Sequence, residues 1–215
     1  MNEIDLTLYG ILDPERSLGR DLARLADEAI SGGCTLLQLR DKKGTTRDMI
    51  ARASAIVEAA AGRVPFLVND RVDVAMVAKA DGVHVGQDDM PVAHVRALMG
   101  ANALVGLSVK TREEARNLPD GLDYICIGGV FDTQSKDNDR SIGVDGWKEL
   151  AEIARKTLPA GMPIGAIAGI DLDGAKELTK AGADGVALIS ALFMEDNVQR
   201  AAREFVMKIE DAQRV

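Results

Sequence analysis

The stretch ADGVHV, from Ala80 to Val85, returns almost unchanged as ADGVAL, from Ala183 to Leu188. In each copy an amphipathic stretch ends before the Ala-Asp-Gly, and an apolar run with strand-forming residues follows it. This near-repeat favours a closed barrel of parallel strands over the competing architecture, an open doubly wound sheet. The first apolar run, LTLYGIL at residues 6–12, also lacks the GxGxxG turn of a dinucleotide-binding sheet.

Short apolar runs alternate with amphipathic stretches along the whole chain. The runs are continuously apolar, which is typical of strands buried on both faces of a parallel sheet. We count eight strand-then-helix units of roughly 25 residues, a number that predicts a (β/α)8 TIM barrel formed by a single domain over residues 1–215. The expected helices cover about residues 18–31, 46–61, 72–78, 91–99, 111–118, 145–156, 174–181 and 198–209.

Charge and cysteine content narrow the class of protein. The net charge of −8 argues against a sequence-independent nucleic-acid surface, which needs an excess of Lys and Arg. Cys34 and Cys126 lie far apart without zinc-site spacing, and no apolar run approaches the ~20 residues of a membrane span. We therefore expect a cytoplasmic protein that binds neither nucleic acid nor membranes. The sequence is compatible with a homo-oligomer.

Polar side chains collect where the expected strands end. In a TIM barrel the carboxyl ends of all strands meet on one rim, and active sites lie there. Asp70 and Asp89 follow neighbouring strands, and such a carboxylate pair suits a hard cation such as Mg²⁺. The residues that we expect to bind substrate on this rim are Gln38, Arg40, Lys42, Asn69, Ser108, Thr133, Ser135, Lys136, Gly169, Ile189 and Ser190.

The rim carries cations as well as carboxylates. Arg40, Lys42 and Lys136 beside a metal pair indicate a phosphorylated small-molecule substrate, and a diphosphate fits best. Lys136 lies in a connection, residues 128–143, that is much longer than usual, and we expect it to form a lid. Gly169 and Gly185, together with the backbone at Ile189 and Ser190, predict a second phosphate site.

Structural roles compete with these functional ones. Arg40 and Lys42 could form a solvated turn, and Asp70 could cap the helix that starts near Val72. We expect both histidines to be structural, since His84 lies inside a buried strand and His94 on a helix. Trp147 is expected to pack the sixth helix onto the barrel.

With these motifs the sequence resembles the thiamine phosphate synthase family, from Tyr9 to about Phe205. The motifs are QLRDK at 38–42, ND at 69–70, ADGVHVGQDD at 80–89, GLS at 106–108, GGVFDTQSK at 128–136 and GADGVALIS at 182–190. The resemblance implies a transferase that uses Mg²⁺ to couple hydroxymethylpyrimidine diphosphate with hydroxyethylthiazole phosphate. The products are thiamine phosphate and pyrophosphate.

The resemblance also implies roles for individual residues. It implies that Asp70 and Asp89 bind the metal, that Gln38 contacts the pyrimidine, and that Ser108 lies beside the reacting centre. We take Ser108, Lys136 and Arg40 as the catalytic candidates. The diphosphate is implied to bind Arg40, Lys42, Asn69 and Lys136, and the thiazole phosphate is implied to bind Gly169, Ile189 and Ser190.

Two departures from the family pattern lie near the expected site. Where the family usually reads GPxxPT in the long connection, this chain has Gly129 and Asp132 in place of the prolines, which predicts a less restrained lid. An added carboxylate at Asp132 could weaken diphosphate binding or alter the metal demand. Where the family reads GIGG, this chain reads AIAG at 166–169, and Ala168 could narrow the thiazole-phosphate site.

Two other functions are compatible with the same barrel. A thiazole tautomerase resembles this family but lacks the acidic pair and carries a histidine where this chain has Lys110. A non-catalytic, ligand-binding regulator would keep the barrel and tolerate the changes at Asp132 and Ala168. The presence of Asp70 and Asp89 argues against the tautomerase.

Overall fold

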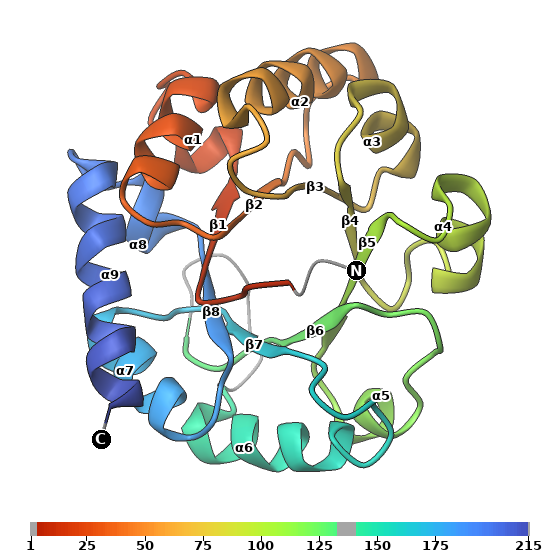
Figure 1. Ribbon diagram of the computed structural model, residues 1–215, viewed down its shortest axis with the longest axis vertical. Helices are drawn as coiled ribbons and strands as arrows, with labels where there is room; N and C mark the ends of the chain where they lie inside the picture. The colour runs from red at the N-terminus through yellow and green to blue at the C-terminus, as the bar shows by residue number, and fades with distance from the viewer. Residues whose placement is uncertain (1–3, 133–140, 215) are drawn as a thin grey trace.

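Eight parallel strands close into a barrel with the helices on its outside (Figure 1). The computed structural model describes residues 4–132 and 141–214. Each strand pairs with the next along the chain, and β8 pairs with β1, so the predicted (β/α)8 barrel is confirmed and the doubly wound sheet is wrong. In the described ranges, no helix combines the length and the apolar character that a membrane crossing requires.

The strands are four to six residues long, and most helices have more than one turn. The strands are β1 (Leu8–Leu12), β2 (Leu36–Leu39), β3 (Phe66–Asn69), β4 (Gly82–Val85), β5 (Leu104–Val109), β6 (Tyr124–Ile127), β7 (Ile164–Ile167) and β8 (Gly185–Leu188). The helices are η1 (Pro14–Arg16), α1 (Leu22–Ser31), α2 (Thr46–Ala60), α3 (Val72–Ala78), α4 (Val92–Met99), α5 (Arg112–Arg116), α6 (Gly143–Ala154), α7 (Leu172–Lys180), α8 (Ser190–Phe193) and α9 (Val198–Gln213).

The expected helices are present, but several ends differ from the prediction. The first helix was expected from residue 18 and begins at Leu22, because Leu18 and Gly19 have positive φ angles of 55° and 72°. Asp21 then caps the helix, since its side chain accepts a hydrogen bond from the backbone N–H of Arg24 at 2.8 Å. Helix α5 is shorter than expected and α9 is longer.

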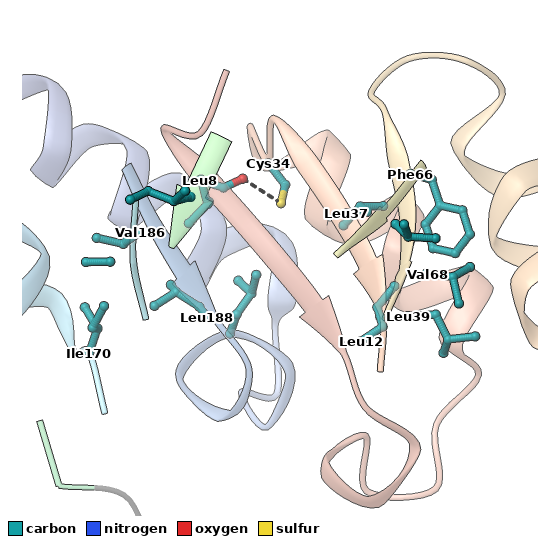
Figure 2. Close-up of a cluster of buried hydrophobic side chains, with 14 of the residues drawn as sticks. Leu8, Leu12, Cys34, Leu37, Leu39, Phe66, Val68, Ile170, Val186 and Leu188 are labelled. Carbon is teal, nitrogen blue, oxygen red and sulfur yellow. Dashed lines mark hydrogen bonds between the residues drawn. The ribbon is translucent and has the colours of Figure 1, made fainter. Parts of the chain in front are cut away.

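In most strands, alternate residues belong to two separate hydrophobic cores. One core fills the barrel interior and includes Tyr9, Leu36, Leu67 and Tyr124. The other lies between the strands and the surrounding helices, and Figure 2 shows part of it around β1, β2, β3 and β8. Because both faces of the strands are buried, the strand sequences are mostly apolar, as the sequence predicted.

The aspartate of the ADG repeat closes the amino end of the barrel. Before every even-numbered strand, a side-chain oxygen accepts a hydrogen bond from a backbone N–H at the start of the preceding strand. The four pairs are Thr35 Oγ1 with Leu8 N (3.1 Å), Asp81 Oδ2 with Phe66 N (2.8 Å), Asp123 Oδ2 with Val105 N (2.7 Å) and Asp184 Oδ2 with Ile164 N (2.7 Å). We call these four contacts the clasps.

The glycine of the repeat is required by close backbone approach. A Cβ at Gly82 would lie 1.9 Å from the carbonyl oxygen of Leu104, and one at Gly185 would lie 1.6 Å from that of Leu6. Leu6 belongs to the segment before β1, which crosses the end of the barrel in Figure 1 and is buried there with Ile4. The amino end is therefore filled, and the carboxyl rim is left for a site. Gly185 begins β8 at the filled end, so the prediction that it helps to form the second phosphate site is wrong.

Candidate functional site

Arg40 is held in place by a buried carboxylate from the neighbouring strand. Its Nη1 lies 2.6 Å from Oδ2 of Asp13, which is only 5% exposed. The other oxygen of Asp13 accepts a hydrogen bond from the backbone N–H of Glu15 at 2.9 Å and so caps η1. Arg40 is thus an oriented cation and not part of a solvated turn. Asp13 was not among the predicted site residues, although it follows β1 on the same rim.

The RDKKG turn after β2 is organised by Asp41. Its Oδ1 accepts a hydrogen bond from the backbone N–H of Gly44 at 2.7 Å, and its Oδ2 pairs with the Arg52 guanidinium of α2. A Cβ at Gly44 would lie 2.3 Å from this carboxylate, so a larger residue there would displace the Asp41 side chain. The turn carries the exposed ammonium group of Lys42 across to the end of β3, where Nζ lies 2.5 Å from Oδ2 of Asp70.

Asp70 and Asp89 lie together on the rim, as the sequence predicted. Burial raises the pKa of the Asp70 carboxyl; Lys42 opposes this shift, and a hydrogen bond and charge repulsion from Asp89 add to it. Asp89 Oδ2 also accepts a hydrogen bond from the backbone N–H of Gly86 at 2.8 Å, which fixes the turn after β4. Two carboxylates therefore share one place beside one ammonium group.

Asp70 does not cap α3, so that competing interpretation is wrong. The N-cap residue of α3 is Arg71, and no side chain caps this helix. Asp70 has a φ of 60°, in the left-handed region, whereas N-cap residues are extended. A strained backbone at a carboxylate on the rim is the kind of feature that a binding site retains.

The carboxylate pair fits a magnesium ion better than a transition metal. Among residues 4–132 and 141–214, no group of three or more His, Cys, Asp or Glu side chains could enclose a metal ion. Mg²⁺ is commonly held by one or two carboxylates, with water and substrate phosphates completing its octahedron. The Lys42 ammonium beside Asp70 shows that this place already attracts a cation.

A chain of hydrogen bonds crosses the barrel interior below the rim and joins five side chains. Gln38 Nε2 donates to the Tyr9 hydroxyl, and this hydroxyl lies 2.9 Å from that of Tyr124. The Tyr124 hydroxyl lies 2.8 Å from Nδ1 of His84, whose Nε2 lies 2.9 Å from Oγ of Ser108. The chain therefore links two predicted substrate-binding residues, Gln38 and Ser108, through three buried aromatic residues. We call it the interior relay.

The aromatic members of the relay are uncharged at neutral pH. Burial raises the pKa of Tyr9 and of Tyr124 above the ordinary tyrosine value. Burial also lowers the pKa of His84 to about 4, against the opposing charge of Asp89. His84 is buried as expected, but its contact with Ser108 was not predicted. The available signal was that Gln38, His84 and Ser108 are polar residues inside otherwise apolar strands.

The remaining predicted residues lie at the ends of β3, β7 and β8. Asn69 is the half-buried last residue of β3 and pairs with His84 in the sheet register. Ile189 is the N-cap residue of α8, and Ser190 is its first residue. Gly169 has a φ of 68° and follows Ala168, whose φ of 93° is rare for a residue with a side chain.

A cavity of about 260 Å³ lies beside Gly169 and α7. Phe131 and Gly174 line it, together with the carboxylates of Asp171, Asp173 and Glu177. These carboxylates make the cavity unsuitable for a phosphate group. The phosphate contact of Gly169 therefore stays a prediction.

Thr133, Ser135 and Lys136 lie outside the described residues. The two described ends of their connection are joined, because the backbone N–H of Ile142 bonds to the carbonyl of Gly129 and that of Gly143 bonds to the carbonyl of Val130, both at 2.9 Å. The connection thus leaves and rejoins the barrel at one point of the rim.

Residues 8–192 match the family model described as thiamine monophosphate synthase. The chain belongs to this family. It is 46% identical over 217 residues to the thiamine-phosphate synthase of Agrobacterium fabrum, with 99% of this chain and 97% of that protein covered. It is 43% identical to the synthase of Chloroflexus aurantiacus, with 94% and 91% covered. The solved thiamine phosphate pyrophosphorylase of Pyrococcus furiosus superposes with a TM-score of 0.83 at 34% identity, with 98% of each chain covered.

Membership of the thiamine monophosphate synthase family makes the region after β7 notable. The backbone N–H of Phe131 bonds to the carbonyl of Ala168 at 3.1 Å, and a Cβ at Gly169 would lie 2.7 Å from the carbonyl oxygen of Asp132. The departures from the family pattern at Asp132 and Ala168 are therefore neighbours in space. The start of the long connection packs directly on the end of β7.

Proposed function

We propose that this chain is a thiamine-phosphate synthase. It joins 4-amino-5-hydroxymethyl-2-methylpyrimidine diphosphate to hydroxyethylthiazole phosphate and releases pyrophosphate. The observation that carries the proposal is the pairing of Asp70 with Asp89 beside Lys42, on the same rim as an Arg40 oriented by Asp13. This arrangement offers a cation site next to two basic side chains, which is what a diphosphate leaving group requires.

The diphosphate is proposed to bind Arg40, Lys42 and Asn69, together with Lys136 from the long connection. Asp70 and Asp89 would hold Mg²⁺, which, when bound, neutralises charge on the departing pyrophosphate. Because Asp13 fixes the guanidinium, Arg40 meets the phosphate oxygens with little loss of side-chain freedom. Lys42, which pairs with Asp70 in this structure, would bind the phosphate when Asp70 holds the metal.

The reaction is a substitution at the methylene carbon of the pyrimidine. The bond from this carbon to the diphosphate oxygen breaks, and a bond from the thiazole nitrogen to the same carbon forms. The 4-aminopyrimidine ring stabilises positive charge on the carbon, so the protein supplies no covalent nucleophile. Its residues bind the leaving group, align the nitrogen and exclude water.

The two organic rings are proposed to occupy different parts of the rim. Gln38 and Ser108 bind the pyrimidine, and the backbone of Gly169, Ile189 and Ser190 binds the thiazole phosphate with help from Thr133 and Ser135. We place the enzyme in the cytoplasm as a single domain over residues 1–215. Exposed apolar side chains on α3 and α4, Met76, Val77 and Leu98, are where a homo-oligomer contact would be sought.

The experiment that tests this function is detection of thiamine phosphate after incubation of the purified protein with both substrates. Product should form with Mg²⁺ and not after chelation. Asp89→Ala should abolish most turnover, whereas Asp88→Ala, which removes an exposed neighbouring carboxylate, should not. Absence of product from folded wild-type protein, or equal activity of the two variants, would refute the assignment.

The regulator and tautomerase alternatives are separated by a binding measurement. Mg²⁺ and pyrophosphate together should stabilise the native state, by about 2.7 kcal/mol at 100 times the dissociation constant. In a chain of this size the gain corresponds to an increase in Tm of about 5–10 °C. A tautomerase without a diphosphate site would show no increase, and a regulator would show the increase without product.

A further inference from the structure

The interior relay has a fixed direction that follows from counting its protons. Gln38 Nε2 donates to the Tyr9 hydroxyl, so the proton of this hydroxyl must point to its other partner, the hydroxyl of Tyr124. Tyr124 in turn donates to Nδ1 of His84. A neutral imidazole with an accepting Nδ1 carries its proton on Nε2, so His84 donates to Oγ of Ser108.

The two ends of the relay are left with opposite hydrogen-bonding character. Ser108 Oγ accepts from His84, so its own proton is free to be donated. Gln38 uses one of its two amide N–H groups on Tyr9, which fixes the orientation of the amide and leaves its Oε1 free to accept. No residue in the described part of the chain donates to Gln38 Oε1 or takes the Ser108 proton. The relay therefore fixes an acceptor at Oε1 of Gln38 and a donor at Oγ of Ser108.

We infer that Tyr9, Tyr124 and His84 are positioning residues that fix Gln38 as an acceptor and Ser108 as a donor toward the substrate. The chemical class that fits is an amino-substituted nitrogen heteroaromatic, with an N–H facing Gln38 and a lone pair facing Ser108. The inference rests on the proposed function for the identity of this ring as the aminopyrimidine. The fixed direction of the relay stands on the contacts alone.

The relay is built to be rigid. Tyr9 and Tyr124 meet edge to face, with ring centroids 5.9 Å apart, and the ring of His84 lies 5.5 Å from that of Tyr124. Gly106 makes room for Tyr124, because a Cβ there would lie 2.1 Å from Cζ of the tyrosine ring. Neither tyrosine can turn away from its partners without disturbing the barrel interior, so the relay holds its direction before substrate binds.

The first test is the tautomer of His84, read from ¹⁵N NMR of protein labelled in its two histidines. The relay requires protonated Nε2 and unprotonated Nδ1 in the free enzyme, and a His84→Gln variant assigns the signals. Tyr124→Phe removes the donor to Nδ1, so it should mix or reverse the tautomers. A wild-type His84 protonated on Nδ1 would overturn the inference.

The second test is kinetic and uses a matched control. Tyr124→Phe should lower kcat/KM by about tenfold, the effect of one hydrogen bond to a reacting group. Thr179→Val also deletes one buried hydroxyl, which donates to Ala175 at 2.8 Å in α7, and should leave kcat/KM unchanged. In a Ser108→Ala background the Tyr124→Phe effect should shrink, because both substitutions act on one contact.

Replacement of His84 itself distinguishes positioning from packing. A glutamine amide at residue 84 can place an N–H where Nε2 was, whereas an asparagine amide reaches only the Nδ1 position. His84→Gln should therefore keep more activity than His84→Asn at similar Tm. An equal loss of kcat/KM in His84→Gln and His84→Asn would overturn the inference. So would a loss of kcat/KM in Tyr124→Phe no larger than that in Thr179→Val. If the wild-type protein forms no product, the proposed function and the substrate class are refuted. The NMR measurement of the His84 tautomer still tests the direction of the relay.

Discussion

Ala168 is the residue whose replacement should make the protein more stable. Its φ of 93° lies beyond the left-handed well that residues with a Cβ tolerate. A side chain in left-handed backbone costs about 1–2 kcal/mol. Glycine removes this cost, but it loses more conformational freedom on folding than alanine does, which reduces the gain in stability by up to about 1 kcal/mol. Ala168→Gly should thus raise the free energy of unfolding by about 0.5–1 kcal/mol.

Urea unfolding of the two proteins measures this difference directly. An unchanged m-value with a higher midpoint would show that native stability has risen. In a chain of this size the expected gain corresponds to an increase in Tm of about 1–4 °C. The matched control is Ala55→Gly, at an exposed position inside α2, which should lose about 1 kcal/mol. If Ala168→Gly loses as much stability as the control, residue 168 is not strained and the reasoning fails.

Three further substitutions test the rim, the interior and the amino end. Asp70→Asn should raise Tm at pH 7. Because the pKa of Asp70 is raised in the native state, native stability falls as pH rises through that pKa, and asparagine removes this loss. The gain in Tm should vanish near pH 4, and a gain independent of pH would contradict the reasoning. Gly106→Ala should cost about 1–3 kcal/mol in urea unfolding by displacing Tyr124, and wild-type stability would exclude that contact. Asp184→Asn should lower Tm by weakening the clasp to Ile164, with activity per folded molecule unchanged.

The barrel and much of its rim could be predicted because they depend on local pattern. Continuous apolar runs locate strands buried on both faces, and the ADG repeat marks the entry to two of them. Once the strands are parallel, their carboxyl ends meet, so the neighbourhood of Asp70 and Asp89 follows from topology. No side-chain geometry is needed for that step.

The interior relay could not be predicted in the same way. Tyr9 and Tyr124 are 115 residues apart, and nothing in their local sequence distinguishes a hydroxyl in a relay from an ordinary core aromatic. The contact depends on strand stagger and on the space left by Gly106. Asp13 was missed for a related reason, since its pairing with Arg40 joins two strand ends that each look like solvated loops.

The four clasps divide the barrel into two-strand modules, β1–β2, β3–β4, β5–β6 and β7–β8. Each clasp binds an even strand to the odd strand before it, and its partners are at most 27 residues apart. A chain reopened between modules, for example at residues 100–103 ahead of β5, keeps all four clasps. A chain reopened between β3 and β4 would put the partners of one clasp at opposite termini. The natural break points for circular permutation therefore lie at the amino end of the barrel, opposite the rim that carries the proposed active site.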